Sequence, residues 1–73
     1  MSMLSERLIQ LKKEKKLFQK DITEAIGVSA RGYQRYEKGE REPTASVLVK
    51  LADFFDVSID YLMGRTEKRE VNK

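Results

Sequence analysis

Four polar side chains recur at helical spacing within the segment ARGYQRYEK of this sequence. They are Arg31, Gln34, Arg35 and Lys38. At about 100° per residue the four share one face of a helix, and the two tyrosines of the segment lie on the other. An arginine fork matches the paired acceptors of guanine, a glutamine amide matches adenine, and lysine reaches phosphates. This face therefore has the chemistry to read base edges in the DNA major groove, or it is an ordinary solvated surface.

The composition excludes most enzyme chemistry. The 73 residues include no cysteine and no histidine, so thiolate zinc sites, imidazole ligands and Ser-His triads are ruled out. The carboxylates are interspersed with lysine and arginine, and none pairs with a nucleophile or forms a metal-binding pattern. We therefore expect a protein that is not an enzyme and that uses no metal and no cofactor.

Positive charge is concentrated in the first half of the chain. The net charge is +3, but residues 1–41 hold ten basic and six acidic side chains, whereas residues 42–64 hold one basic and four acidic ones. The first half is thus the candidate surface for an anion. No apolar run is long enough for a membrane span and the start lacks the apolar region of a signal peptide, so a cytoplasmic location is expected.

Apolar spacing and capping residues predict a single all-α domain of five short helices. The first helix carries leucines at i, i+4 and i+7 and runs to about Lys15; the second starts near Gln19 and is ended by Gly27. Ser29 caps a third helix that ends near Lys38, before Gly39. The fourth opens at residues 43–44, and the fifth is capped by Ser58 and ended by Gly64. Residues 1–64 form the domain, and residues 65–73 are expected to be a flexible charged tail.

The second and third helices together have the geometry of a helix-turn-helix. A two-turn helix, a glycine-led turn and a capped helix with a basic outer face are its three parts, and its second helix reads base edges. Context therefore favours the base-reading interpretation of the polar face.

The sequence resembles the Cro/C1-type (XRE-family) helix-turn-helix domain of bacterial and phage repressors. The resemblance covers about residues 4–64 and rests on two stretches, QKDITEAIGVSARGYQRYEKGEREPT and LVKLADFFDVSIDYLMG. The glutamine opening helix two, the Gly-Val-Ser turn, the Tyr-Glu-x-Gly close and the Pro-Thr start occur in order. It implies a compact lambda-repressor-like fold and a nucleoid-associated regulator, a repressor above all, that binds a double-stranded DNA operator.

Functional residues are carried over from this resemblance position by position. The positions that touch base edges correspond to Ala30, Arg31, Gln34 and Arg35. The positions that contact phosphates correspond to Gln19, Ser29, Lys38 and Arg41. A structural ion pair between helix one and the end of helix three corresponds to Lys12 with Glu37.

Three residues depart from the family pattern. Phe18 replaces the usual serine or threonine cap of helix two, so that helix start is weaker by about 1 kcal/mol, or Phe18 packs inward instead. Lys16 replaces a common glycine, which makes a left-handed turn less comfortable. Gly32 lies inside helix three: either its missing side chain lets the helix approach the DNA backbone, or it relieves a crowded contact with helix two.

The tyrosines of helix three and the C-terminal end of the chain carry two further expectations. The i, i+3 spacing of Tyr33 and Tyr36 favours core packing over stacking on single-stranded bases. One domain binds an operator weakly, so a homodimer on a palindromic site is expected. Its contact candidates are Ile59, Met63 and Val71. The alternative function is an antitoxin or adaptor that uses the same fold, which an acidic surface with exposed apolar residues on helices four and five would favour.

Overall fold

The computed structural model describes residues 3–70, and these form five α-helices with no strand. The helices are α1 (Met3–Glu14), α2 (Gln19–Ile26), α3 (Ala30–Lys38), α4 (Ala45–Phe55) and α5 (Ile59–Leu62). The all-α prediction with five helices is therefore confirmed. Three bounds differ slightly from those expected. Helix α1 ends one residue before Lys15, α4 begins after Thr44, and α5 ends at Leu62 with Met63 as its C-cap, so Gly64 does not end it.

Hydroxyl side chains start three of the helices. The Oγ of Ser29 accepts from the N–H of Gly32 at 3.1 Å, and the Oγ of Ser58 accepts from the N–H of Tyr61 at 3.0 Å. The Oγ1 of Thr44 accepts from the N–H of residue 47 at 3.4 Å, with Pro43 lying outside the helix. Each cap satisfies a backbone donor that the first helical turn leaves unpaired, which fixes the residue at which each of these helices starts.

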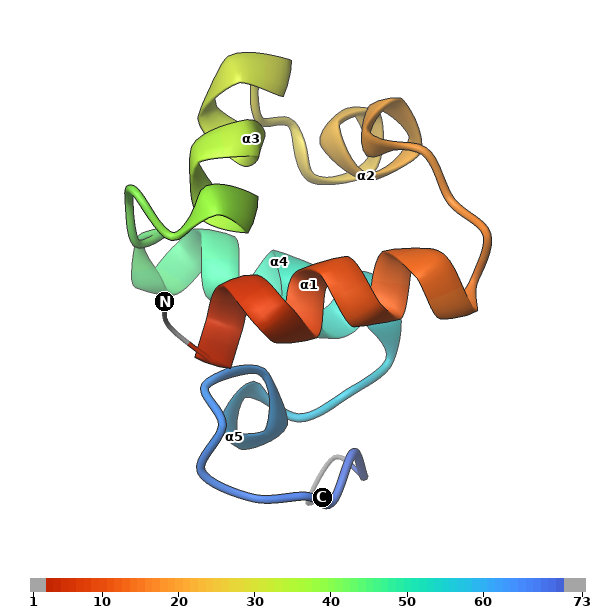
Figure 1. Ribbon diagram of the computed structural model, residues 1–73, viewed down its shortest axis with the longest axis vertical. Coiled ribbons are helices and arrows are strands. Elements are labelled where there is room, and N and C mark those ends of the chain that lie inside the picture. The colour runs from red at the N-terminus through yellow and green to blue at the C-terminus, as the bar shows by residue number, and fades with distance from the viewer. Residues whose placement is uncertain (1–2, 71–73) are drawn as a thin grey trace.

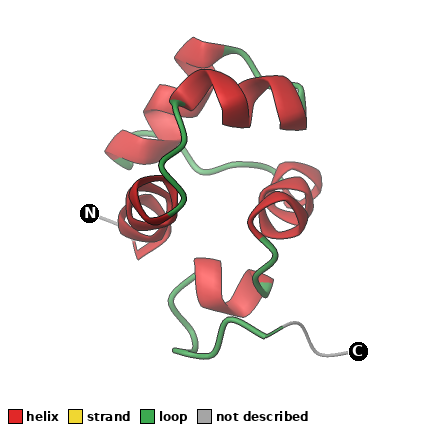
Figure 2. Ribbon diagram, turned by 90° about the vertical axis from the view of Figure 1, so that its right-hand side faces the viewer, coloured by secondary structure: helices red, strands yellow, loops and turns green. Residues whose placement is uncertain are grey.

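The helices form three levels along the longest axis of the molecule (Figure 1). The pair α2 and α3 lies at one end, α1 and α4 cross the middle, and α5 lies at the other end with the C-terminal segment. Figure 2 looks almost along α1 and α4 and shows α2 and α3 above them. The shared core includes fully buried side chains from every helix, among them Leu8, Leu11, Ile22, Tyr33, Leu51 and Leu62. This packing holds α2 and α3 at a fixed angle, because each contacts a helix of the middle level.

The turn between α1 and α2 contains two locally unfavourable residues. Lys16 adopts a left-handed backbone with φ 54°, the conformation expected where related proteins have glycine. Phe18 occupies the cap position of α2 without a side-chain hydrogen bond, and its side chain is 77% exposed. The inward packing of Phe18 is therefore wrong. Instead, the carboxylate of Asp21 accepts from the N–H of Phe18 at 2.8 Å, which supplies half of a capping box.

Substituting Lys16→Gly should stabilise the fold by about 0.5–1 kcal/mol. A left-handed backbone costs a residue with a Cβ about 1–2 kcal/mol, and the greater freedom of glycine in the unfolded chain offsets part of that gain. Chemical denaturation of both proteins measures the difference. Substituting Lys15→Gly, at an exposed neighbour whose φ is not positive, is the matched control and should not stabilise. An unchanged or lower stability of Lys16→Gly would show that the turn is not strained.

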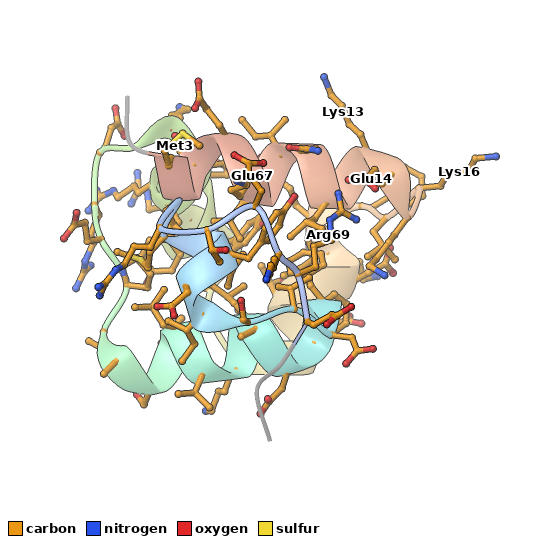
Figure 3. All side chains as sticks on the ribbon, turned by 90° about the horizontal axis from the view of Figure 1, so that it is seen from below. Met3, Lys13, Glu14, Lys16, Glu67 and Arg69 are labelled. Atoms are coloured by element: carbon orange, nitrogen blue, oxygen red, sulfur yellow. The ribbon has the colours of Figure 1, made fainter. Side chains whose placement is uncertain are left out.

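Residues 65–70, which we call the C-terminal segment, pack against α1 and α5. Both terminal nitrogens of the Arg69 guanidinium group donate to the Glu14 carboxylate, at 3.0 and 2.6 Å, and Figure 3 shows Arg69 reaching that end of α1. The Arg69 carbonyl accepts from the N–H of Ser58 at 2.8 Å. The guanidinium groups of Arg7 and Arg69 lie 4.0 and 5.1 Å from the centroid of the Tyr61 ring. The segment expected to be a flexible tail thus makes defined contacts over its first six residues.

Candidate nucleic-acid interface

A three-residue turn joins α2 to α3. Gly27 ends α2 in a left-handed conformation with φ 74°, and its N–H donates to the carbonyl of Thr23 at 2.9 Å. Val28 packs partly against the core, and Ser29 begins α3. A side chain at Gly27 would be strained by the positive φ even though open space surrounds it. The glycine therefore allows the tight turn that sets α2 against α3.

The outer face of α3 is polar and exposed. Its exposed residues include Ala30, Arg31, Gln34, Arg35 and Lys38. On the inner face the Tyr33 side chain is fully buried and the Tyr36 side chain is 7% exposed, with the two rings edge to face. The core interpretation of the tyrosines is confirmed, so neither is available to stack on a base. All four base-reading candidates lie together on one accessible helix face.

A chain of hydrogen bonds connects this outer face to α1. The Nζ of Lys12 lies 2.9 Å from Oε1 of Glu37, so the expected ion pair is present. The same oxygen accepts from Nε2 of Gln19 at 3.2 Å. The Oε1 of Gln19 in turn accepts from Nε2 of Gln34 at 3.3 Å. Gln19, which the resemblance assigns to phosphate, thereby also orients Gln34, which is assigned to bases.

Glu37 anchors the buried end of this chain. Its side chain is 8% exposed, and its Oε2, like the hydroxyl of Tyr33, has no hydrogen-bond partner of good geometry within residues 3–70. Burial raises the pKa of Tyr33 strongly, and the negative charge of Glu37 raises it further. Tyr33 therefore stays neutral and acts as a packing residue whose hydroxyl has at most a weak interaction with the Glu37 carboxylate.

Removing that hydroxyl with Tyr33→Phe should leave stability near neutral pH almost unchanged. The hydroxyl makes no strong hydrogen bond, so its loss removes little. Because the pKa of Tyr33 is higher in the folded than in the unfolded protein, only the unfolded chain ionises as the pH rises above about 10. The parent therefore loses stability there, by up to about 1.4 kcal/mol per pH unit, and loses none below that pH. Denaturation from pH 8 to 11 should show a shallower decline for Tyr33→Phe than for the parent. Parallel declines would contradict the assignment.

The phosphate candidates differ in how freely they can bind. Lys38 and Arg41 are exposed, and neither forms an ion pair within the described residues. The hydroxyl of Ser29 accepts the cap hydrogen bond and keeps its own proton for donation. Gln19 is half-buried and has one amide hydrogen left after its bond to Glu37. Each of the four thus retains at least one donor.

Gly32 does not relieve crowding against α2. A Cβ built at Gly32 would lie 3.2 Å from Oγ of Ser29 and 3.4 Å from Cγ1 of Val28, and no atom of α2 lies within 4 Å. Both neighbours belong to the turn that precedes the helix. A crowded contact with helix two therefore does not explain the glycine at position 32, and that alternative is wrong. The other alternative, that the missing side chain lets helix three approach the DNA backbone, stays a prediction.

Helix α5, which contains Ile59 and is followed by Met63, lies at the opposite end of the molecule from α2 and α3 (Figure 1). Ile59 and Met63 are 39% and 38% exposed, whereas the neighbouring Leu62 is fully buried in the core. Val71 lies outside the described residues. Within residues 3–70, no helix is long and apolar enough to cross a membrane, and no group of acidic side chains could hold a metal ion.

Residues 8–62 match the protein family described as helix-turn-helix. Among curated relatives, the HTH-type transcriptional regulator YqaE of Bacillus subtilis is 39% identical over 69 residues, which cover 94% of this chain and 60% of the relative. The cryptic phage CTXphi transcriptional repressor RstR of Vibrio cholerae is 42% identical over 62 residues, which cover 85% and 55%. This chain thus spans little more than half the length of these relatives.

Solved structures share the same fold. The P22 c2 repressor in complex with a synthetic operator superposes with a TM-score of 0.80 at 28% identity, covering 86% of this chain and 96% of that one. A transcriptional regulator from Listeria innocua superposes with a TM-score of 0.79 at 36% identity, covering 96% and 61%. These matches agree with the lambda-repressor-like architecture expected from the sequence.

Proposed function

Because the chain belongs to the helix-turn-helix family of XRE, Cro/C1-type transcriptional regulators, we propose that it binds a specific double-stranded DNA operator and acts as a repressor. The observation that carries the proposal is the outer face of α3, where the base-reading candidates are exposed together and Gln34 is held by Gln19. The P22 c2 repressor, whose structure contains an operator, has the same arrangement of helices. We assign the activity to residues 1–64.

Each part of this surface has a proposed role. Arg31 and Arg35 donate to guanine edges in the major groove, Gln34 reads adenine, and Ala30 contacts the base edge at the start of the helix. The exposed Lys38 and Arg41, together with Ser29 and Gln19, hold phosphates. The first turn of α2 adds the positive end of a helix dipole beside Gln19. Specificity therefore comes from α3, and general affinity comes from its surroundings.

A homodimer supplies the affinity that one domain lacks. We propose that two copies bind half-sites about 34–36 Å apart on a palindromic operator. Ile59 and Met63, exposed near the C-terminal end of the fold, are the proposed contacts, together with Val71, which follows later in the sequence. Loss of dimerisation should then weaken operator binding without changing the preferred half-site.

The experiment is a selection of binding sites from a randomised duplex library with the purified chain. The affinity of the selected site is then compared with that of scrambled DNA at two salt concentrations. A palindromic site with a large specificity ratio supports a dimeric operator-binding repressor. Weak, salt-sensitive binding without enrichment would contradict the proposal, because it is what a generic basic surface gives.

One observation favours a second candidate, an antitoxin or adaptor. A hollow of about 440 Å³ lies between α4, the start of α5 and the C-terminal segment. Its lining includes the carboxylates of Asp53, Asp60 and Glu70 and the apolar side chains of Val49 and Ile59. Three carboxylates against one cation, Lys68, beside exposed apolar side chains suit a basic, partly apolar protein segment. Co-purification of a defined protein that blocks DNA binding would support this candidate.

A further inference from the structure

Phe18 is the most exposed large hydrophobic side chain in residues 3–70. It is 77% exposed, against 45% for the next, Val49. It stands at the cap position of α2, where a serine or aspartate side chain would satisfy a backbone donor, and it forms no such bond. The side chain therefore contributes neither to the core nor to the helix start.

Lys16, two residues before Phe18, is also locally unfavourable. Lys16 stands in a left-handed backbone that glycine would adopt without strain. Only Leu17, between Lys16 and Phe18, packs against the core. Lys16 and Phe18 are both locally unfavourable, and no contact made by either side chain within the described residues compensates for this. Such uncompensated residues are typical of a functional surface. We therefore expect the turn between α1 and α2 to have a function besides connecting the two helices.

The charge around Phe18 specifies the partner. Lys15 and Lys16 are exposed and form no ion pair within the described residues, and Figure 3 shows Lys16 extending away from the fold. On the other side of Phe18, Lys20 lies 4.0 Å from Glu24, and the Asp21 carboxylate is held by the Phe18 N–H. A surface that combines cations with an exposed aromatic ring matches a polyanion that also has apolar parts. The sugar-phosphate backbone of DNA is such a polyanion, because each charged phosphate adjoins an apolar deoxyribose.

The position of Phe18 places this surface beside the reading helix. Phe18 directly precedes Gln19, and the Oε1 of Gln19 accepts a hydrogen bond from Gln34 on the outer face of α3 at 3.3 Å. A duplex seated on α3 therefore runs past the start of α2. We propose that Phe18 packs on a deoxyribose of that backbone, with Lys15 and Lys16 on the adjoining phosphates. This inference rests on the proposed function and extends its DNA-contacting surface to the turn before α2.

The substitution Phe18→Ser separates stability from binding. Serine restores a cap, so the midpoint of thermal unfolding should rise. Loss of the ring that would pack on the deoxyribose should lower affinity for the selected operator about tenfold. Phe18→Leu keeps an apolar side chain and should lose about threefold or less. Met3→Ser, which removes another exposed hydrophobic side chain at the start of α1, is the matched control and should leave affinity unchanged.

Hydroxyl-radical footprinting tests the contact itself, because the radical attacks deoxyribose. The parent protein should protect sugars at one short backbone segment beside each half-site, and Phe18→Ser should lose that protection while keeping the rest of the footprint. If the parent binds its operator and Phe18→Ser binds within twofold of it with the same footprint, this inference is overturned and the proposed function stands. If the parent itself binds no site selectively, the proposed function fails, and the inference fails with it.

Discussion

Replacing Arg35 with alanine is expected to weaken binding to the selected operator by about 1–3 kcal/mol, or about 5- to 150-fold. Arg35 is exposed on the outer face of α3, one turn after Arg31, and its guanidinium group has no ion-pair partner within residues 3–70. A bidentate contact to guanine would be lost together with its discrimination against other bases. Arg31→Ala should behave in the same way at a different base pair.

The measurement is the affinity of each variant for the operator and for a panel of single-base substitutions. If Arg35 contacts a base, the variant should lose affinity for the best site and should no longer discriminate between bases at one position of the operator. Lys38→Ala is the matched control, because Lys38 lies on the same face of α3 as Arg35 but is proposed to contact a phosphate. It should weaken binding evenly and reduce the salt slope by about one. An even loss for Arg35→Ala would reassign Arg35 to phosphate.

Local signals explain why the helices could be predicted from the sequence. Ser29, Thr44 and Ser58 each cap the helix expected to follow them, and Gly27 and Gly39 end α2 and α3 with positive φ. Caps and stops act over a few residues, so they can be recognised without knowledge of the fold. The outer face of α3 was predictable for the same reason, because helical periodicity alone separates Arg31 and Arg35 from the buried tyrosines.

Contacts between distant residues could not be predicted in the same way. The hydrogen bond from Gln34 to Gln19 depends on how α2 crosses α3, and the bidentate contact of Arg69 with Glu14 joins residues 55 positions apart. The chain has three glutamines and many opposite charges, and nothing in their spacing selects these partners. The high charge of residues 65–73 predicted a flexible tail, whereas Arg69 and the ring of Tyr61 give the C-terminal segment a defined path.

The exposure of Phe18 also required the structure. The sequence identified Phe18 as a departure from the family pattern but left two alternatives, a lost cap or inward packing. The structure decides between them because Leu17, and not Phe18, fills the space against the core. An aromatic residue in a short turn has two neighbours that compete for the same space, and only the path of the backbone determines which one is buried.

Substituting Lys12→Met is expected to destabilise the fold by about 2–3 kcal/mol. The side chain of Lys12 is 19% exposed and that of Glu37 is 8% exposed, so the substitution leaves a nearly buried carboxylate without its cation. The hydrogen bond from Gln19 to the Glu37 carboxylate remains, so the loss of stability should be small for a broken buried ion pair. Chemical denaturation at neutral pH measures the change. Lys13→Met, at an exposed neighbour on the same helix, is the matched control and should change stability by less than about 0.5 kcal/mol.

The double substitution Lys12→Met with Glu37→Leu distinguishes a structural pair from one that also serves recognition. Replacing both partners removes the unpaired carboxylate, so most of the lost stability should return. The same change removes the acceptor that fixes the amide of Gln19, and Gln19 is the residue that holds Gln34. The double variant should therefore fold well yet discriminate less sharply at the base pair assigned to Gln34. Recovery of stability with unchanged discrimination between bases would mean that the hydrogen-bond chain stabilises the fold but has no role in recognition.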